Sequence, residues 1–216
     1  MSVWTIVCAG GAGHRFGSVK QYAALGEQRL IDHAVANAAA ASDFVVVGAP
    51  ADDVDDLRWA FASTKIKVIP GGVLRSDTVR CALAVIPAIA EVIVVHDAAR
   101  PLAPPALFDS VVAAVRGGAD AAVPGLVPPD TVKRVAGDVV VETLDRSELV
   151  LVQTPQAFRA DVLRAAHVGN PDATDDAALV ERAGGKVVVV PGSPAAHKVT
   201  TPDDLAALAQ RLGQQA

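Results

Sequence analysis

The sequence predicts an α/β protein whose mostly parallel, twisted sheet carries helices on both faces. Three observations lead to this prediction. Hydrophobic residues make up 51% of the chain and aromatic residues only 4%, a composition that suits helices packed on parallel strands. Short valine- and isoleucine-rich runs alternate with helical patterns, as in successive βαβ units. The length of 216 residues fits a single domain, residues 1–216, whose core needs no disulfide or metal.

The predicted strands are short, continuous apolar runs, typical of strands that are buried on both faces. They run from Val3 to Cys8, Phe44 to Val47, Ile66 to Ile69, Val92 to Val95, Ala121 to Val123, and Val187 to Val190. Apolar residues at the spacing of one helical face predict a helix over Leu107 to Val115, with Pro104 and Pro105 at its start. Thr201 before Pro202 predicts a capped closing helix.

Residues 131–144 break this rhythm. Their sequence, TVKRVAGDVVVETL, contains two short alternating segments around Ala136-Gly137-Asp138, which predicts a β-hairpin rather than a crossover helix. A lone hairpin does not bury both of its faces. We therefore expect a protruding arm at about residues 130–150 that pairs with another subunit, the alternative being a hairpin that lies on its own domain.

Composition narrows the class of protein. The net charge is −5 and the 19 Lys and Arg residues form no long run, so we expect no nucleic-acid partner. No apolar stretch reaches membrane-spanning length, and the first residues lack a basic leader, so we expect a cytoplasmic protein without a membrane partner. Cys8 and Cys81 have neither metal-ligand nor redox spacing, and both are expected to be buried thiols.

The first predicted strand runs into a glycine-rich segment, AGGAGHRFG, at residues 9–17. Free backbone N–H groups at the carboxyl end of such a strand are typical of phosphate binding. The P-loop pattern is absent, and Phe16 stands where a dinucleotide fingerprint would need glycine. Arg15 and Lys20 follow, so the segment favours a polyphosphate ligand, although both cations could equally be solvated surface charges.

Motifs along almost the whole chain resemble the family of 2-C-methyl-D-erythritol 4-phosphate cytidylyltransferases, which have a Rossmann-like nucleotidyltransferase fold. The segments that carry the resemblance, in the family's order, are AGGAGHRFG, KQY at Lys20 to Tyr22, GGVLRSDTV at Gly71 to Val79, VHDAARP at Val95 to Pro101, DTVKR at Asp130 to Arg134, QTPQAF at Gln153 to Phe158, TDDAALVE at Thr174 to Glu181, and KVTTPDDL at Lys198 to Leu205. VHDAARP is the most specific. The resemblance implies that CTP and 2-C-methyl-D-erythritol 4-phosphate react to 4-diphosphocytidyl-2-C-methyl-D-erythritol and pyrophosphate, in non-mevalonate isoprenoid precursor synthesis.

The resemblance also implies residue roles, and the chemistry of joining two anions agrees with them. Arg15, Lys20 and Lys198 match the family's catalytic cations around the triphosphate and the transferred phosphoryl group. Asp97 matches a carboxylate close to Mg²⁺, or another divalent cation; a helix N-cap is its alternative role. His96 is expected to orient the loop.

Two further sets of positions carry over from the family. The nucleotide-binding positions are Ala9, Gly10, Gly11, Gly13, Gly72, Thr78 and Ala98, with a plain turn as the alternative for Gly71-Gly72. The positions that bind the polyol phosphate are Asp97, Arg100, Thr131, Arg146, Thr154 and Thr174, with a helix N-cap as the alternative for Thr174. In the family the partner subunit presents the positions of Thr131 and Arg146, which implies an obligate homodimer.

The first loop departs from the family pattern. Val19 stands where proline usually precedes the lysine, and the stretch between Arg15 and Lys20 is about two residues shorter than usual, by comparison with the family. The double-glycine form of the loop also resembles cytidylyltransferases of ribitol 5-phosphate and other pentitol phosphates, which is the alternative substrate class. A third possibility is a catalytically silent homologue that binds nucleotide only.

Overall fold

The computed structural model describes residues 2–10, 20–171 and 173–213. Among these residues a central sheet of eight strands runs through the molecule. Seven of them follow the order β10-β7-β11-β6-β1-β4-β5, and the eighth, β12, also pairs with β7. The strands are β1 (Val3–Cys8), β4 (Phe44–Ala49), β5 (Ile66–Pro70), β6 (Val92–Asp97), β7 (Ala121–Leu126), β10 (Leu151–Val152), β11 (Gln156–Arg159) and β12 (Val187–Pro191). All the predicted strands are confirmed, each within three residues of its predicted end.

Most of the sheet is parallel, as predicted. The pairs β1–β4, β1–β6, β4–β5 and β7–β12 are parallel, whereas β11 runs antiparallel between β6 and β7, and β10 pairs antiparallel with β7. The sequence prediction did not include β10 and β11. Because β11 runs backwards, its first residues lie at the carboxyl edge of the sheet, beside the end of β6.

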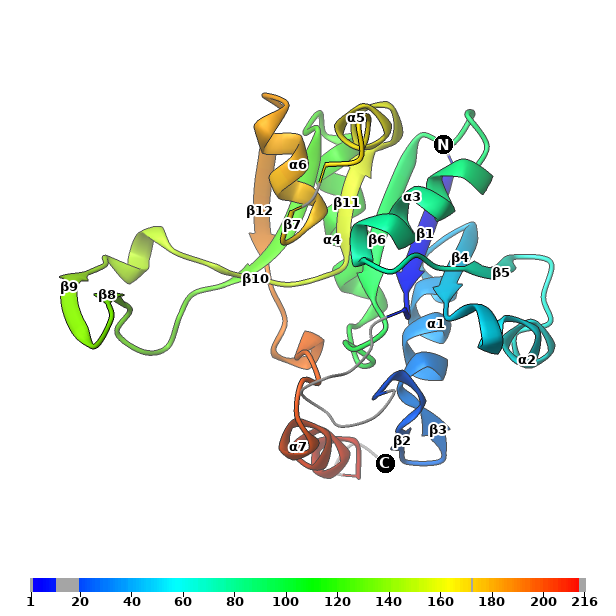
Figure 1. The fold of residues 1–216 in the computed structure, drawn as a ribbon, viewed down its shortest axis with the longest axis horizontal. Helices are drawn as coiled ribbons and strands as arrows, with labels where there is room; N and C mark the ends of the chain where they lie inside the picture. Colours follow the sequence, from blue (N-terminus) through cyan, green and yellow to red (C-terminus); the bar gives the residue numbers. More distant parts are fainter. Residues whose placement is uncertain (1, 11–19, 172, 214–216) are drawn as a thin grey trace.

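Helices cover both faces of the sheet, each over its own hydrophobic cluster (Figure 1). One face packs against α1 (Leu30–Ala40), α2 (Val54–Ala60) and α4 (Pro105–Arg116). The opposite face packs against α3 (Arg75–Val85), α5 (Ala160–Ala166) and α6 (Asp176–Arg182). Short 3₁₀ turns are η1 (Lys20–Tyr22), η2 (Ala51–Asp53), η3 (Arg146–Glu148) and η4 (Pro194–Ala196).

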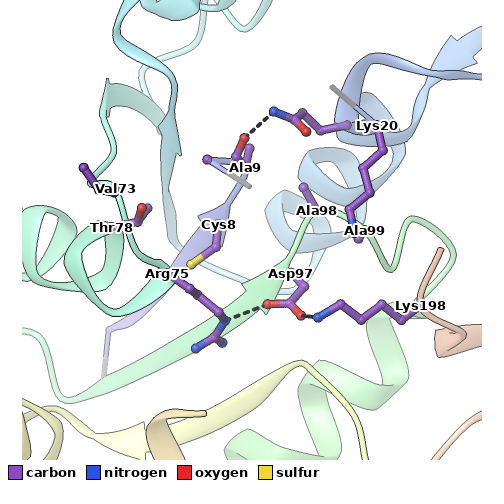
Figure 2. A pocket seen from close by; sticks show the side chains of 12 residues that line it. Cys8, Ala9, Lys20, Val73, Arg75, Thr78, Asp97, Ala98, Ala99 and Lys198 are labelled. Atoms are coloured by element: carbon purple, nitrogen blue, oxygen red, sulfur yellow. Dashed lines mark hydrogen bonds and ion pairs between the residues drawn. The ribbon is translucent and has the colours of Figure 1, made fainter. Parts of the chain in front are cut away.

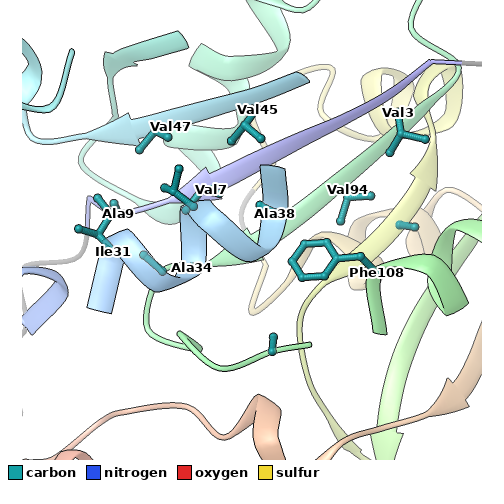
Figure 3. Close-up of a cluster of buried hydrophobic side chains, with 14 of the residues drawn as sticks. Val3, Val7, Ala9, Ile31, Ala34, Ala38, Val45, Val47, Val94 and Phe108 are labelled. Carbon is teal, nitrogen blue, oxygen red and sulfur yellow. The ribbon is translucent and has the colours of Figure 1, made fainter. Parts of the chain in front are cut away.

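The two-residue alternation of each strand explains why both faces are apolar. In β1, Val3 and Val7 point to the cluster under α1 and α4 (Figure 3). Ile6 belongs to the cluster under α3, on the opposite face. Phe108 of α4 is fully buried in the first cluster. A strand that is buried on both sides needs apolar residues throughout, which is the pattern that made these strands predictable.

A third, smaller cluster attaches the closing helix α7 (Pro202–Gly213) to the body. Leu208 of α7 and Val199 pack with Leu25 and Leu30. Leu25 belongs to the short hairpin of β2 (Ala24–Leu25) and β3 (Gln28–Arg29), and Leu30 follows that hairpin as the first residue of α1. Asp204 accepts hydrogen bonds from the backbone N–H groups of residues 200 and 201, both at 2.8 Å. These contacts fix the segment that precedes α7, which includes Lys198.

The predicted hairpin is present as β8 (Lys133–Ala136) and β9 (Val139–Thr143), an antiparallel pair. It projects away from the body of the molecule, between the end of β7 and β10 (Figure 1). All of its residues are exposed, and they include Val139, Val140 and Val141 on β9. This arm, residues 130–150, leaves several valine side chains exposed, and its pairing with a partner stays a prediction.

The cysteine prediction is half wrong. Cys8 lies mostly buried at the end of β1, and burial raises the pKa of its thiol to about 12. Cys81 is exposed, because the buried stripe of α3 runs through Val79, Ala82 and Leu83 and leaves position 81 on the outer face. Within the described ranges, none of the helices is both long enough and apolar enough to span a bilayer.

Candidate active site

The carboxyl ends of β1 and β6 open into a cavity of about 220 Å³ (Figure 2). Cys8 and Asp97, the last residues of the two strands, are directly paired in register. Parallel strands end at the same edge of a sheet, so residues that are distant in the chain meet there. The cavity is lined by Cys8, Ala9, Gly10, Lys20, Gln21, Val73, Arg75, Thr78, Asp97, Ala98, Ala99 and Lys198.

Small residues and a fixed backbone form the wall of this first cavity near α3. The backbone N–H of Gly72 donates to Oγ1 of Thr78 at 3.1 Å. A Cβ atom at Gly72 would lie 2.0 Å from the Cβ of Asp77, so a side chain there would push the wall out of place. On the opposite wall, Gln21 Nε2 donates to the carbonyl oxygen of Ala9 at 2.7 Å. The double glycine is thus a close backbone approach and not only a turn.

Asp97 is the electrostatic centre of the site. Its Oδ1 accepts from Arg75 Nε at 2.9 Å and its Oδ2 accepts from Lys198 Nζ at 2.7 Å, and the two cations reach it from opposite sides (Figure 2). Burial alone would raise the pKa of this carboxyl, but the charges of Arg75 and Lys198 outweigh burial and hold the pKa far below its usual range. Asp97 is therefore a charged, doubly paired carboxylate at neutral pH.

A second cavity, also about 220 Å³, lies on the other side of this ion-pair group. It is lined by Arg75, Asp97, Arg100, Val152, Gln153, Thr154, Gln156, Thr174, Asp175 and Lys198. Arg75, Asp97 and Lys198 line both cavities and form the wall between them. Two ligands bound side by side would meet at this shared wall.

The floor of the second cavity is a buried hydrogen-bond network. Thr154 Oγ1 accepts from the backbone N–H of Asp97 at 3.0 Å and lies 3.2 Å from His96 Nδ1. The other ring nitrogen of His96 is 3.2 Å from the carbonyl oxygen of Arg100, whose Nη1 donates to the carbonyl oxygen of Ala196 at 2.6 Å. Burial lowers the pKa of His96 to about 4, so the ring is neutral and orients the loop as predicted.

Most of the described residues of the predicted site line one of the two cavities or both. Ala9, Gly10, Lys20, Thr78 and Ala98 line the first alone, with Gly72 bonded behind Thr78; Arg100, Thr154 and Thr174 line the second alone; Asp97 and Lys198 line both. Gly11, Gly13 and Arg15 lie outside the described residues. Thr131 and Arg146 are exposed on the arm and belong to neither set of lining residues.

The alternative role of Thr174 as a helix N-cap is wrong. Asp175 is the N-cap of α6, with its Oδ1 accepting from the backbone N–H of Ala178 at 3.0 Å. The other oxygen of Asp175 accepts from Gln156 Nε2 at 2.8 Å. Thr174 is left exposed at the mouth of the second cavity.

Sequence reasoning missed Arg75, Gln153, Gln156 and Asp175 as site residues. Each lies in one of the segments that carry the family resemblance, GGVLRSDTV, QTPQAF or TDDAALVE. The signal for Arg75 was a cation at the start of a helix that follows a strand-end loop. Its two carboxylate partners lie far along the chain, so spacing gave no indication of them.

The residues fit a divalent cation only if substrate supplies most of its ligands. Across the part of the chain that the structure describes, no group of three or more His, Cys, Asp or Glu side chains could hold a metal ion. Asp97 is a single carboxylate, each oxygen of which accepts a hydrogen bond from one cation, and a carboxylate oxygen can accept more than one such contact. Mg²⁺ commonly binds through one or two carboxylates together with substrate phosphates, so this donor set suits an ion that arrives with a polyphosphate.

A cavity at the strand ends with Gly10 in its lining, which shares Arg75, Asp97 and Lys198 with a second polar cavity, suits the chemistry of a nucleotidyltransferase. Comparisons with known proteins specify the class further. Residues 3–214 match the family profile described as IspD, 2-C-methyl-D-erythritol 4-phosphate cytidylyltransferase. The chain belongs to this family.

Individual relatives agree with the family match. A Saccharopolyspora erythraea protein named 2-C-methyl-D-erythritol 4-phosphate cytidylyltransferase is 48% identical over 95% of this chain and 97% of its own length. A Nocardia farcinica protein of the same name is 45% identical over 94% of this chain and 91% of its own. The crystal structure of 4-diphosphocytidyl-2C-methyl-D-erythritol synthase from Anaerococcus prevotii superposes with a TM-score of 0.87, at 25% identity over 98% of both chains.

Proposed function

We propose that this chain transfers the cytidylyl group of CTP to 2-C-methyl-D-erythritol 4-phosphate and releases pyrophosphate, in isoprenoid precursor synthesis. The observation that carries the proposal is the shared wall of Arg75, Asp97 and Lys198 between two cavities. The family and its relatives support this acceptor over ribitol 5-phosphate.

The reaction needs positioning and charge neutralisation rather than a protein nucleophile. An oxygen of the acceptor phosphate forms a bond to the α-phosphorus of CTP, and the bond from that phosphorus to the bridging oxygen of the β-phosphate breaks. The electron pair leaves with pyrophosphate, so no proton needs to move. Two anions approach each other, and cations at the point of contact stabilise the charge on the non-bridging oxygens.

Each cavity supplies part of this chemistry. In the first, Lys20 and Lys198 would neutralise the triphosphate together with Arg15, while the backbone at Gly10 would leave room for a pyrimidine, with Gly72 holding Thr78 behind it. In the second, Arg100 would hold the acceptor. A Mg²⁺ ion bound with CTP beside Asp97 would polarise the phosphates.

The arm would complete the acceptor site of a partner subunit in a homodimer. Arg146 and Thr131 lie on this exposed arm, whose strand β9 presents valines at positions 139–141. A planar guanidinium suits an acceptor phosphate because it donates two parallel hydrogen bonds. Sedimentation should show a dimer, and Arg146→Ala should raise the acceptor KM and leave the KM for CTP unchanged. The matched control is Arg134→Ala, because Arg134 is also exposed on the arm, where it pairs with Glu142. A normal KM for the acceptor in Arg146→Ala would contradict the shared site.

Pyrophosphate release with CTP and Mg²⁺ tests the main proposal. The assay compares 2-C-methyl-D-erythritol 4-phosphate with D-ribitol 5-phosphate, and CTP with UTP. Lys198→Ala should lose about 100-fold in rate or more, on the scale of one donor to a transition-state oxyanion, whereas the exposed Lys65→Ala should not change it. Preference for ribitol 5-phosphate would overturn the acceptor assignment, and no release with either acceptor would support a silent nucleotide-binding protein.

A further inference from the structure

We propose that Asp176, supported by His167, is a positioning residue for the transfer reaction: through Arg75 it holds Asp97 and Lys198 in the wall between the two cavities. The inference rests on the proposed function, since it assigns a role within the same site. Asp176 lines neither of the two cavities in the described structure. It would therefore act on the reaction only through Arg75.

A continuous line of polar contacts joins these residues. His167 Nε2 lies 3.0 Å from Asp176 Oδ1, and Asp176 Oδ2 accepts from Arg75 Nη1 at 2.6 Å. Arg75 Nε in turn donates to Asp97, which accepts from Lys198 on its other oxygen. The line starts at the end of α5, passes through the first residues of α6 and α3, and reaches the last residue of β6.

The side chains along this line of contacts differ in how deeply they are buried. The side chain of Asp176 has 0% of its surface exposed and that of His167 has 3%, against 28% for Arg75 and 39% for Lys198. A fully buried carboxylate is costly unless it is paired and hydrogen-bonded. Asp176 uses both oxygens in this way, so it is a buried anchor for Arg75, and the two cations that line the cavities are the more exposed members of the group.

Arg75 depends on this anchor for its orientation. Its long side chain could adopt many rotamers, but two carboxylates hold the guanidinium at Nε and Nη1. Its third nitrogen, Nη2, is buried and has no hydrogen-bond acceptor among the described residues. Without Asp176, Nη1 of Arg75 would lose its acceptor as well, and Nε would be the one guanidinium nitrogen still bonded to a described residue. The guanidinium would then turn toward Asp97 or into a cavity.

The line also balances charge at the wall. Lys198, Asp97, Arg75 and Asp176 alternate in sign, so the group is neutral overall. Neutralising Asp176 would leave one excess positive charge beside Asp97 and strengthen the hold of Arg75 on that carboxylate. Lys198 would then be held less tightly where the two substrates meet, and in-line geometry is sensitive to displacements of about 1 Å.

The test is Asp176→Asn, which keeps the shape of the side chain and removes its charge. We expect kcat to fall by roughly ten- to a hundredfold, on the scale of a small misplacement of reacting groups, while the KM for CTP changes by less than about threefold. Asp161→Asn is the matched control, because Asp161 forms an exposed ion pair with Arg159 at the far edge of the sheet. A variant with reduced melting temperature but normal kcat would show a purely structural role and overturn the proposal.

A second variant and a second readout cover the remaining outcomes. Arg75→Lys keeps the positive charge but removes the planar guanidinium that bonds two carboxylates at once, so it should reproduce the loss in kcat. Adding Asp176→Asn to this variant should cause little further loss. If Asp176→Asn does not fold, Arg75→Lys decides, and a normal kcat in that variant overturns the proposal. Fully additive losses would also overturn it.

A nuclear magnetic resonance measurement is independent of catalysis. The Nε–H of Arg75, donated to Asp97, should give a signal that exchanges slowly with water and disappears in Arg75→Lys. We expect the signal to shift in Asp176→Asn, because the guanidinium is reoriented on Asp97, and to stay unchanged in Asp161→Asn; an unchanged signal in Asp176→Asn would refute the positioning role. If the wild-type protein transfers nothing to either acceptor, the proposed function fails, while this signal still decides whether Asp176 positions Arg75.

Discussion

Replacing Asp97 by Asn separates the electrostatic role of this residue from its shape. The substitution keeps the side chain nearly isosteric and removes the negative charge that two cations share. Breaking a buried ion pair costs about 3–5 kcal/mol. Here Lys198 is 39% exposed and can hydrate, and Arg75 keeps Asp176 as a partner. We therefore expect unfolding to become easier by about 2 kcal/mol, discounted for solvent screening.

That free energy corresponds to a drop in melting temperature of about 4–8 °C for a chain of this size. The kinetic effect should be larger, because Lys198 loses the partner that places it: kcat should fall about 100-fold, the scale of one misplaced transition-state donor. Binding of CTP without Mg²⁺ should instead become tighter. The substitution removes one negative charge. For a phosphate placed on the order of 8 Å away, Coulomb's law at an effective dielectric constant near 20 gives about 2 kcal/mol, and about half of that after screening.

Three measurements on one preparation check this reasoning: thermal unfolding, steady-state pyrophosphate release, and calorimetric titration with CTP in the presence of a chelator. Asp55→Asn is the control, since Asp55 forms an exposed pair with Arg58 far from the cavities. A variant with wild-type kcat, or one that binds metal-free CTP more weakly, would refute the view that Asp97 balances the two cations.

Further predictions concern pH, thiol chemistry and backbone packing. Burial holds the pKa of His96 at about 4 in the folded protein, against 6.5 in the unfolded chain. The unfolded chain therefore binds the extra proton, and the free energy of unfolding should fall by up to about 3 kcal/mol as the pH drops from 6.5 to 4. His96→Asn should flatten this pH dependence when it is measured by urea unfolding. Iodoacetamide at pH 8 should alkylate the exposed Cys81 and spare Cys8, whose pKa is raised to about 12; peptide mass mapping that finds Cys8 modified first would contradict this. Gly72→Ala should raise the KM for CTP and lower the free energy of unfolding by about 1–3 kcal/mol, because the new Cβ would lie 2.0 Å from that of Asp77. An unaltered KM would show that the backbone near residue 72 can shift without disturbing the cavity.

The sheet was predictable because its central strands are buried on both faces and read as continuous apolar runs. The strand β11, sequence QAFR, has no such run and is held by long-range pairing with β6 and β7. The two-residue strands β2, β3 and β10 fall below the length at which a pattern is visible. The exposed position of Cys81 was within reach of sequence reasoning, since Val79, Ala82 and Leu83 already define the buried stripe of α3.

Residues at strand ends were the predictable part of the site. Asp97 and the segment after Cys8 follow apolar strands, and the carboxyl ends of parallel strands meet at one edge. The pairing of Arg75 with Asp176 was not predictable, because 101 residues separate them and nothing along a single chain indicates which of many carboxylates an arginine will meet.

The same separation has a consequence for when the enzyme becomes active during synthesis. Arg75 and Asp176 are 101 residues apart, and so are Asp97 and Lys198. Chains emerge from the ribosome amino end first, and contacts between distant residues form late because they close long loops. The central strands β1, β4, β5 and β6 can pair while the chain is half made, yet the wall between the cavities then still lacks its outermost cation. If Lys198 has the proposed role, a nascent chain paused before it would hold most of its sheet and lack one of the cations that the transfer needs, so full activity would appear only after the last segment docks.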